Sequence, residues 1–489
     1  MNRNYLISIV AVCVLLAPLS PARAQTVNSN LAPGAPGKDA QWPDAGKLAV
    51  GTSNTLESKV WFTLRDGVMT DVYYPTVDVA NTRVLQFIVV SADGKRVETE
   101  EADTTHRVEV LDPQALTFRQ VNTAKSGAYT ITKTYVTDPA RPTVLIDVEF
   151  KGRGGERLYV YYDPSLNNSG MHDSAWSQGQ AGGVTGKLAH GDQAFLSSDA
   201  DKASAVVYSP RPKELGHWGR VTSGYFETSD GLAELRRKGR LSETYLRAAD
   251  GNVVQVAEIR AELSGVLQGP LREGDTSDTA FTLALGFGRE PNEALRNARQ
   301  SLLKGFAAAR AEYEAGWHEY VRTLRRVGAK YEAQFDMAAM VLKAHEDKTF
   351  RGAMIASLSV PWGGGANANE PNVGGYHLVW SRDLYQVATA FYALGDKASA
   401  DRALDYLFRV QQKADGSFPQ NSWLDGRPFW GSLQLDEVAY PLILAYQLGR
   451  TDNETWTKHV RRAADFIVKN GPHTPQERWE EESGYSPST

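Results

Sequence analysis

The amino-acid sequence predicts a multidomain protein with an N-terminal antiparallel β-sandwich, a helical linker and a C-terminal all-α region. Two observations support this prediction. Short runs of β-branched and aromatic residues, separated by Gly, Asp, Asn and Pro, fill about the first 290 residues. Beyond Pro291 the apolar residues recur at helical spacing, and strand signals nearly vanish. A length of 489 residues allows two or three domains of about 100–250 residues each.

The first 24 residues have the features of a secretion signal. Arg3 provides the positive start, an apolar run extends from Leu6 to Leu19, and Ala22-Arg23-Ala24 fits the small-x-small cleavage pattern. The alternative is a membrane anchor, but the run is shorter than the roughly 20 residues of a membrane span and contains Pro18. We therefore expect removal of residues 1–24, a secreted or periplasmic protein, and no membrane association afterwards.

The composition excludes several classes of function. The only cysteine, Cys13, lies in this signal, so the mature chain is expected to have no disulfide and no cysteine-bound metal. A net charge of −5 provides no basic face for nucleic acid. The 11 Trp and 21 Tyr residues suit stacking on sugars, although aromatic residues also commonly fill cores.

The sandwich is assigned to residues 25–288. Apolar residues alternate along 144–150 and along 281–287, as in strands with one buried face. Further runs rich in β-branched and aromatic residues lie at 58–64, 84–90, 157–162 and 205–208. Many short strands over about 250 residues indicate a large antiparallel sandwich.

Residues 289–328 are assigned to a linker helix, because apolar residues from Leu295 to Tyr320 recur at helical spacing. Residues 329–489 are predicted to be all-α. Pro441 should kink one of the helices or move its start to a later residue. The five expected helices lie near 331–342, 384–391, 403–410, 435–446 and 456–467.

The loops between these helices contain residues that suit glycosidic bond cleavage. That reaction needs a protonated carboxyl beside the leaving oxygen and a second carboxylate across the sugar ring. Glu480 is the candidate acid, because the Trp479 ring would desolvate it and the negative Glu481 would also raise its pKa. The alternative is a solvated acidic run at a helix start.

Other polar and aromatic residues have both a functional and a structural interpretation. Arg382 and Asp383 either bind sugar hydroxyls or form an ordinary ion pair at a helix N-terminus. Trp362, Trp380, Trp423 and Trp430 either stack on sugars or pack in the core.

Other chemistries lack their usual motifs. His345 and His377 have no partner at metal-ligand spacing, and Gly363-Gly364-Gly365 is not followed by the Lys-Ser/Thr of a phosphate loop. Gly51-Thr52-Ser53 is not a nucleophile elbow, and no segment has the spacing of a calcium loop. We therefore expect no metal and no cofactor.

Together these motifs resemble glycoside hydrolase family 15, which includes glucoamylases and glucodextranases, in its bacterial form. The resemblance covers essentially the whole mature chain. It rests on the following segments, which occur in the family's order: Val60–Leu64, Val72–Asp78, Ala344–Ala353, Trp380-Ser-Arg-Asp383, Trp430-Gly-Ser-Leu-Gln-Leu-Asp436 and Arg478–Tyr485.

The resemblance implies a β-supersandwich, a linker and an (α/α)6 barrel. It also implies an exo-acting α-glucosidase that releases glucose from the non-reducing ends of α-glucans with inversion. The expected partner is an α-glucan oligo- or polysaccharide, and the protein is expected to be a monomer. In this family Glu480 would be the general acid, Gln434 and Asp436 would support the site, and the substrate would be bound by Trp380, Arg382, Asp383, Trp430, Trp479 and Glu481.

The sequence departs from the family in one respect. An (α/α)6 barrel takes twelve helices, whereas residues 329–489 suffice for roughly five and the start of a sixth. The family's general base lies far downstream of the acid, so no residue here is assigned to it. We therefore expect an incomplete barrel, with exposed apolar helix faces, and no α-glucan hydrolysis by the 489-residue chain alone.

Three alternatives stay open at this stage. The first alternative is a non-catalytic secreted carbohydrate-binding or structural fragment, because fold alone does not determine function. A phosphorylase of related architecture would use phosphate in place of the base-activated water. Within the hydrolase interpretation, α-1,4, α-1,6 and trehalose-type linkages all place a terminal glucose in the same pocket.

Overall fold

The computed structural model describes residues 31–177, 194–210, 216, 218–260, 278–359, 366–368, 375–476 and 483–487. Several predictions concern residues outside these ranges: the signal at 1–24, Trp362, the glycines at 363–365, and Trp479, Glu480 and Glu481. They remain predictions.

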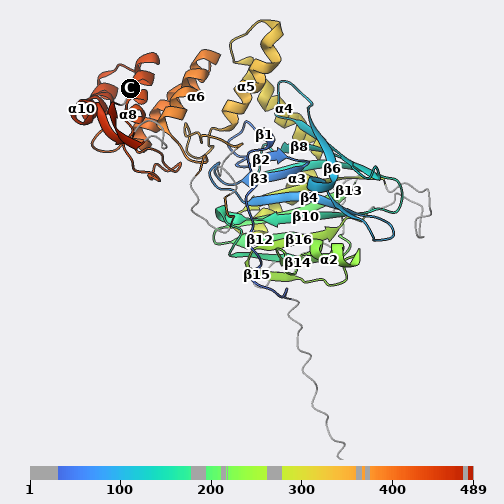
Figure 1. The fold of residues 1–489 in the computed structure, drawn as a ribbon. Helices are drawn as coiled ribbons and strands as arrows, with labels where there is room; N and C mark the ends of the chain where they lie inside the picture. Colours follow the sequence, from blue (N-terminus) through green and yellow to red (C-terminus); the bar gives the residue numbers. More distant parts are fainter. Residues whose placement is uncertain are drawn as a thin grey trace, which may run out of the picture.

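Two antiparallel β-sheets form the N-terminal part, as the sequence predicts (Figure 1). The first has strand order β1-β2-β3-β4-β10-β16-β14, with β5 paired to β4. Its strands are β1 Lys47–Gly51, β2 Trp61–Arg65, β3 Val68–Tyr73, β4 Thr82–Val90, β5 Val97–Thr99, β10 Arg157–Pro164, β14 Val221–Tyr225 and β16 Val253–Glu258.

The second sheet has strand order β15-β11-β12-β13-β17-β9-β8-β7-β6. Its strands are β6 Thr104–Val110, β7 Phe118–Ala124, β8 Tyr129–Thr137, β9 Thr143–Gly152, β11 Asp173–Ser177, β12 Phe195–Asp199, β13 Lys202–Pro210, β15 Arg247–Gly251 and β17 Thr279–Gly288. Two short helices, α1 Glu100–Asp103 and α2 Gly231–Lys238, lie within this part of the chain and were not predicted.

Strand β17 is buried on both faces, although its alternating sequence predicts only one buried face. The reason is helix α3, Pro291–Lys304, which packs on β17 and β13. Gly286 and Gly288 permit this close approach, because a Cβ atom at either position would lie 2.6 Å from a backbone atom of Ala294.

The predicted linker helix is two helices. Helix α3 ends at Lys304 and α4, Phe306–Arg322, begins two residues later. Gly305 separates them with a φ of +86°, which lies outside the helical region and which residues with a side chain rarely adopt. Apolar spacing that continues across a break of one residue does not reveal the break, so the expectation of one helix was wrong.

The five expected C-terminal helices are all present. Helix α8 begins at Leu435 with Pro441 inside it, so of the two expected effects of Pro441, a kink or a later start, the later start does not occur. The helical segments are α5 Glu332–Ala344, α6 Ser381–Leu394, α7 Lys397–Tyr406 with the π-helical segment η3 Leu407–Gln411, α8 Leu435–Gln447, α9 Asn453–Thr455, the π-helical segment η4 Trp456–Val460 and α10 Arg461–Asn470.

The prediction of an all-α C-terminal region was wrong in one place. Strand β18, His473–Gln476, pairs antiparallel with β19, Ser483–Pro487. Both strands are short, and prolines at 475 and 487 obscure the alternating pattern that would reveal them. The division at 25–288, 289–328 and 329–489 remains a proposal, while β17 ends at Gly288 and α5 begins at Glu332.

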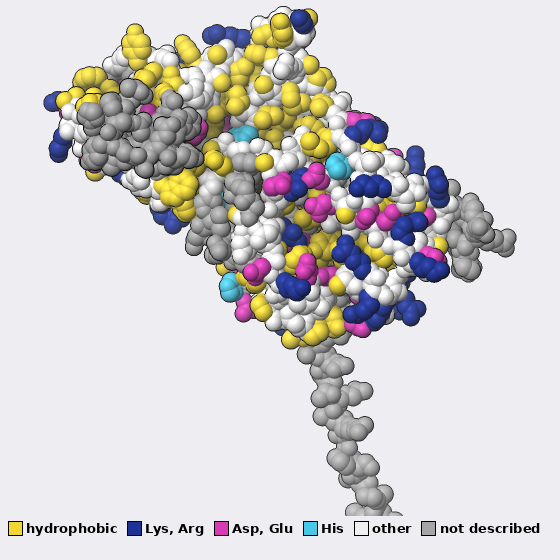
Figure 2. All heavy atoms as spheres, viewed as in Figure 1, with side chains coloured by type: hydrophobic (Ala, Val, Ile, Leu, Met, Phe, Trp, Pro, Cys, Tyr) yellow, Lys and Arg dark blue, Asp and Glu magenta, His cyan; other side chains and the backbone are white. Residues whose placement is uncertain are grey.

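One continuous apolar core joins the two parts of the molecule. It extends from Trp61 and Phe62 in the sandwich, through Trp317 on α4, to Leu384 on α6 and Val438 on α8. In Figure 2 apolar side chains gather over α4 and α5, whereas charged side chains are spread over the sandwich. No helix within the described ranges has both the length and the apolar character needed to cross a membrane.

Candidate functional site

The N-terminal ends of α6 and α8 meet, and they bring together residues from two of the sequence motifs. The Ser381 hydroxyl lies 2.5 Å from both the main-chain carbonyl oxygen and the carboxyl Oε2 of Glu437. The main-chain N–H of Arg382 donates to the same Oε2 at 2.8 Å. One buried glutamate on α8 therefore binds the first turn of α6.

Pro441 explains why the Glu437 carbonyl is available to another helix. In an α-helix this carbonyl would accept from the N–H of residue 441, which proline lacks. The Ser381 hydroxyl donates to it instead. The Ser381 hydroxyl has a single proton and can donate it to only one of the two Glu437 oxygens nearby. If that proton goes to the carbonyl, a protonated Glu437 carboxyl can donate to the Ser381 oxygen in turn.

The guanidinium of Arg382 donates hydrogen bonds to Asp436 and Gln434 and makes an ion-pair contact with Glu437. Its Nη1 lies 2.9 Å from Glu437 Oε1, 3.0 Å from Asp436 Oδ2 and 3.1 Å from Gln434 Oε1. The Arg382 side chain is only 11% exposed. Burial alone would lower its pKa, but the charges of Glu437 and Asp436 outweigh that effect and raise it.

Glu437 is fully buried, and burial raises its pKa to about 8 against the opposing effects of Arg382 and Ser381. Its carboxyl is therefore mostly protonated at neutral pH. Glu437 is not among the site residues that the sequence predicted. A signal existed, because Glu437 shares helical spacing with the buried Pro441 and Leu444, and a charged residue on a buried stripe is unusual.

Aromatic residues form a corner beside this cluster. Trp380 is buried, and its ring meets that of the 40%-exposed Trp430 edge-on, with centroids 5.9 Å apart. Tyr376, also partly exposed, lies 6.1 Å from Trp380. Trp423 instead packs against His377 and Phe429. Trp430 thus keeps exposed surface that a ligand can contact, and the buried Trp380 packs against its ring.

The structure brings together five of the predicted site residues: Trp380, Arg382, Trp430, Gln434 and Asp436. Asp383 lies in the first turn of α6, and its charge contributes to the raised pKa of Arg382. Among the described residues, no group of three or more His, Cys, Asp and Glu is arranged to hold a metal ion.

The predicted acid and its neighbours, Trp479, Glu480 and Glu481, lie outside the described residues. The chain that leads toward them passes the candidate site. Gly471 lies against the first residue of α8, since a Cβ atom there would be 3.0 Å from Leu435 Cδ1. On either side of the acidic motif, Gln476 pairs with Ser483.

Two protein-family models together match most of the chain. Residues 32–322 match the model described as glucodextranase, domain N, and residues 335–415 and 410–489 match glycosyl hydrolases family 15. An uncharacterized glycosyl hydrolase from Methanocaldococcus jannaschii is 27% identical over 97 residues, which are 19% of this chain and 16% of that protein.

Two similar proteins match over nearly the whole chain. A glucoamylase from Clostridium sp. (strain G0005) is 37% identical over 476 residues, covering 96% of this chain and 62% of that protein. The crystal structure of a bacterial glucoamylase complexed with acarbose is 37% identical with a TM-score of 0.82, covering 93% of this chain and 63% of that chain. The present chain thus spans less than two thirds of the length of either protein.

Proposed function

Because the chain belongs to glycosyl hydrolase family 15, with a glucodextranase-type N domain, we propose that the protein is an exo-acting α-glucosidase of the glucoamylase type. It would release glucose from the non-reducing ends of α-glucans by an inverting mechanism that uses two carboxyl groups. The acarbose complex of the similar bacterial glucoamylase supports an oligosaccharide substrate.

The observation that carries the proposal is the cluster at the joined ends of α6 and α8. Arg382, fixed by Gln434, Asp436 and Glu437, is proposed to donate to hydroxyls of the terminal glucose, and Asp383 to accept from them. The ring of Trp430, supported by Trp380, is proposed to stack on the sugar. Positioning by buried partners restricts the guanidinium, which favours binding in one orientation.

Glu480 is proposed as the general acid, with Trp479 and Glu481 beside it contributing to substrate binding. The support is the family motif at 478–485 and the passage of the preceding chain along the start of α8. The two-carboxyl mechanism also needs a general base, and no residue of the printed sequence is assigned to it.

The assignment of Glu480 is tested with a chimera that continues past Thr489 with the corresponding part of the Clostridium enzyme. Glu480→Gln should lower kcat for maltotetraose by about 10²–10⁴, because the amide cannot protonate the leaving oxygen. The matched control is Glu482→Gln in the same acidic run, which should stay within several-fold of the parent chimera. Equal loss in both variants would contradict the assignment, and maltose binding without turnover would favour the carbohydrate-binding alternative.

Export is proposed from the features of residues 1–24. The mature protein from the periplasm or medium should begin at Gln25, as mass spectrometry can check, and retention of the first 24 residues would refute the proposal.

A further inference from the structure

A cavity of about 300 Å³ lies where the sandwich meets the helical region, and we call it the junction pocket. Its walls include the loop 52–56, Tyr320 on α4, Arg351, and Asp396 and Arg402 at α7. The candidate site lies at the N-terminal end of α6, whereas Asp396 follows the C-terminal end of that helix. The 14-residue helix is about 21 Å long, so the two sites are separate.

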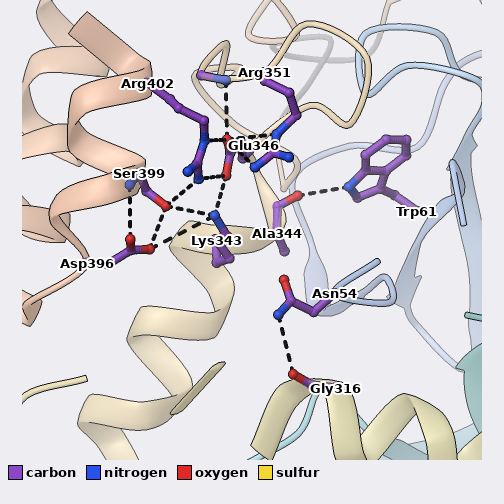
Figure 3. Close-up of polar contacts among 11 residues, drawn as sticks. Asn54, Trp61, Gly316, Lys343, Ala344, Glu346, Arg351, Asp396, Ser399 and Arg402 are labelled. Atoms are coloured by element: carbon purple, nitrogen blue, oxygen red, sulfur yellow. Dashed lines mark hydrogen bonds and ion pairs between the residues drawn. The ribbon is translucent and has the colours of Figure 1, made fainter. Parts of the chain in front are cut away.

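One side of the junction pocket is a network centred on the buried carboxylate of Glu346 (Figure 3). This carboxylate accepts from Arg402 at 2.7 and 2.9 Å, from Arg351 at 3.2 Å, and from Lys343. Burial alone would raise the pKa of Glu346, but hydrogen bonds from Arg402 and the charge of Lys343 lower it to about 2. Glu346 therefore stays ionised and offsets the positive charges around it.

Ser399 and Asp396 extend the same network. The Ser399 hydroxyl lies 2.7 Å from both Lys343 Nζ and Arg402 Nη2, and it donates to Asp396 at 2.5 Å (Figure 3). Asp396 is also the N-cap of α7. The network thus holds three cationic groups, Lys343, Arg351 and Arg402, and two anionic groups, Glu346 and Asp396, and these links restrict their positions.

The opposite side comes from the sandwich and α4. Trp317 Nε1 donates to the carbonyl of Thr52 at 2.9 Å, and Asn54 Nδ2 donates to the carbonyl of Gly316 at 3.3 Å. Nearby, Trp61 Nε1 donates to the carbonyl of Ala344 at the end of α5, at 2.9 Å (Figure 3). The open pocket therefore lies between segments that are distant in sequence and that direct hydrogen bonds hold together.

The chemistry of the lining indicates the class of ligand. The three cations and two anions of the network leave only a small net charge, and they offer arginine donors and carboxylate acceptors at fixed positions. Hydroxyl and amide groups of loop 52–56 add further partners, whereas the side chains of Trp317 and Tyr320 at the cavity are buried. A ligand with several adjacent hydroxyl groups suits this combination. The volume is at the lower end of the roughly 300–1,000 Å³ of small-molecule sites.

We propose that the junction pocket is a second saccharide-binding site, which takes one or two glucose units. Binding there connects the sandwich loop, α4 and α7. A bound saccharide therefore stabilises the junction between the sandwich and the helical region. This inference does not depend on hydrolysis at the candidate site.

The test is calorimetric titration of the 489-residue protein with maltose. The background variant Trp430→Ala weakens binding at the candidate site, because it removes the exposed ring there. We expect one remaining site with a Kd of about 1–10 mM, the range given by a few hydrogen bonds in a water-accessible pocket. Adding Arg351→Met should raise the Kd about tenfold or more, because it removes a hydrogen-bond donor of the pocket. A tenfold change in Kd corresponds to about 1.4 kcal/mol.

Arg310→Met is the matched control. Arg310 and Arg351 are both 34% exposed and each pairs with one glutamate, Glu314 or Glu346, but Arg310 lies outside the junction pocket. The control should leave the Kd unchanged. No binding up to about 50 mM maltose, or equal Kd values for the two arginine variants, overturns the proposal.

A second variant keeps the test valid if Arg351→Met does not fold. Thr323 is exposed at the pocket, and Thr323→Trp would fill the cavity without removing a charged group. Maltose binding should then be lost while the thermal unfolding temperature stays close to that of the background variant. Undiminished binding to a folded Thr323→Trp protein likewise overturns the proposal.

Discussion

At Arg382, a buried guanidinium and a buried carboxyl lie 2.9 Å apart and yet do not form a simple ion pair. Burial raises the pKa of Glu437 to about 8, so at neutral pH the main partner of the Arg382 charge is Asp436. Glu437 then acts mostly as a neutral hydrogen-bonding group that holds the start of α6. Its charge, and with it the field at the candidate site, changes above neutral pH.

The raised pKa predicts how stability depends on pH. The folded protein holds the Glu437 proton over a range in which the unfolded chain, with an ordinary carboxyl pKa, has lost it. Stability therefore falls as pH rises from about 5 to 8, and Glu437→Gln should remove this part of the decrease, on the order of 1–4 kcal/mol. Scanning calorimetry of both proteins across this range measures it.

Glu454→Gln is the control for this measurement, because Glu454 is an exposed glutamate paired with Lys458. It should follow the parent protein over the same pH range. If Glu437→Gln also runs parallel to the parent, then Glu437 is ionised in the folded protein at neutral pH.

At the scale of elements, α6 and α8 are connected at a point where Pro441 interrupts the hydrogen bonding within α8. Pro441 leaves the Glu437 carbonyl without its usual helical donor, and the Ser381 hydroxyl at the start of α6 supplies the hydrogen bond. A proline inside a helix is ordinarily unfavourable. Here it provides an acceptor through which the neighbouring helix is positioned, and Arg382 follows directly after Ser381.

This arrangement predicts coupling between residues 381 and 441. Ser381→Ala should destabilise the protein by about 1–3 kcal/mol, because it leaves a buried carbonyl without a donor. In a Pro441→Ala background the restored N–H can donate to that carbonyl, so Ser381→Ala should be less destabilising by about 0.5–1.5 kcal/mol. Thermal or denaturant unfolding of the four proteins gives the interaction energy. Additive effects would mean that the proline and the hydroxyl act independently.

At the scale of the molecule, the sandwich and the helical region share one core and a set of direct bonds. Asp78, in the sandwich, is buried, and its pKa is raised to about 6, first by burial and further by the charge of Asp347 beyond α5. Asp347 accepts from the main-chain N–H of Val77 at 3.0 Å. Two carboxyl groups, one from each region, therefore lie near each other at this boundary.

Asp78 predicts a second pH effect at lower pH. Because its pKa is higher in the folded protein than in the unfolded chain, stability falls as pH rises from about 4 to 6. Asp78→Asn, which can still accept from Thr76, should remove about 1–3 kcal/mol of that decrease in a calorimetric pH series. The exposed Asp93→Asn is the comparison variant and should not flatten the profile. A profile of Asp78→Asn that parallels the parent below pH 6 would show that Asp78 is ionised in the folded protein.

The sequence by itself was sufficient for the division into a strand-rich first part and a helical second part, for the five C-terminal helices, and for the motifs that contain Trp380, Arg382 and Trp430. These features are local, because an alternating or helical period extends over a few neighbouring residues. The break at Gly305 and the β18–β19 pair were missed, since a single residue or a very short strand barely changes the period.

Only the tertiary structure placed Glu437 against Arg382 and let Ser381 donate to the carbonyl that Pro441 leaves open. These partners are 55 to 56 residues apart along the chain, and they meet because two helix ends pack together. The raised pKa of Glu437 likewise comes from burial by that packing. Local patterns thus determined the elements, whereas the packing of distant segments decided which groups meet and which of them carry charge.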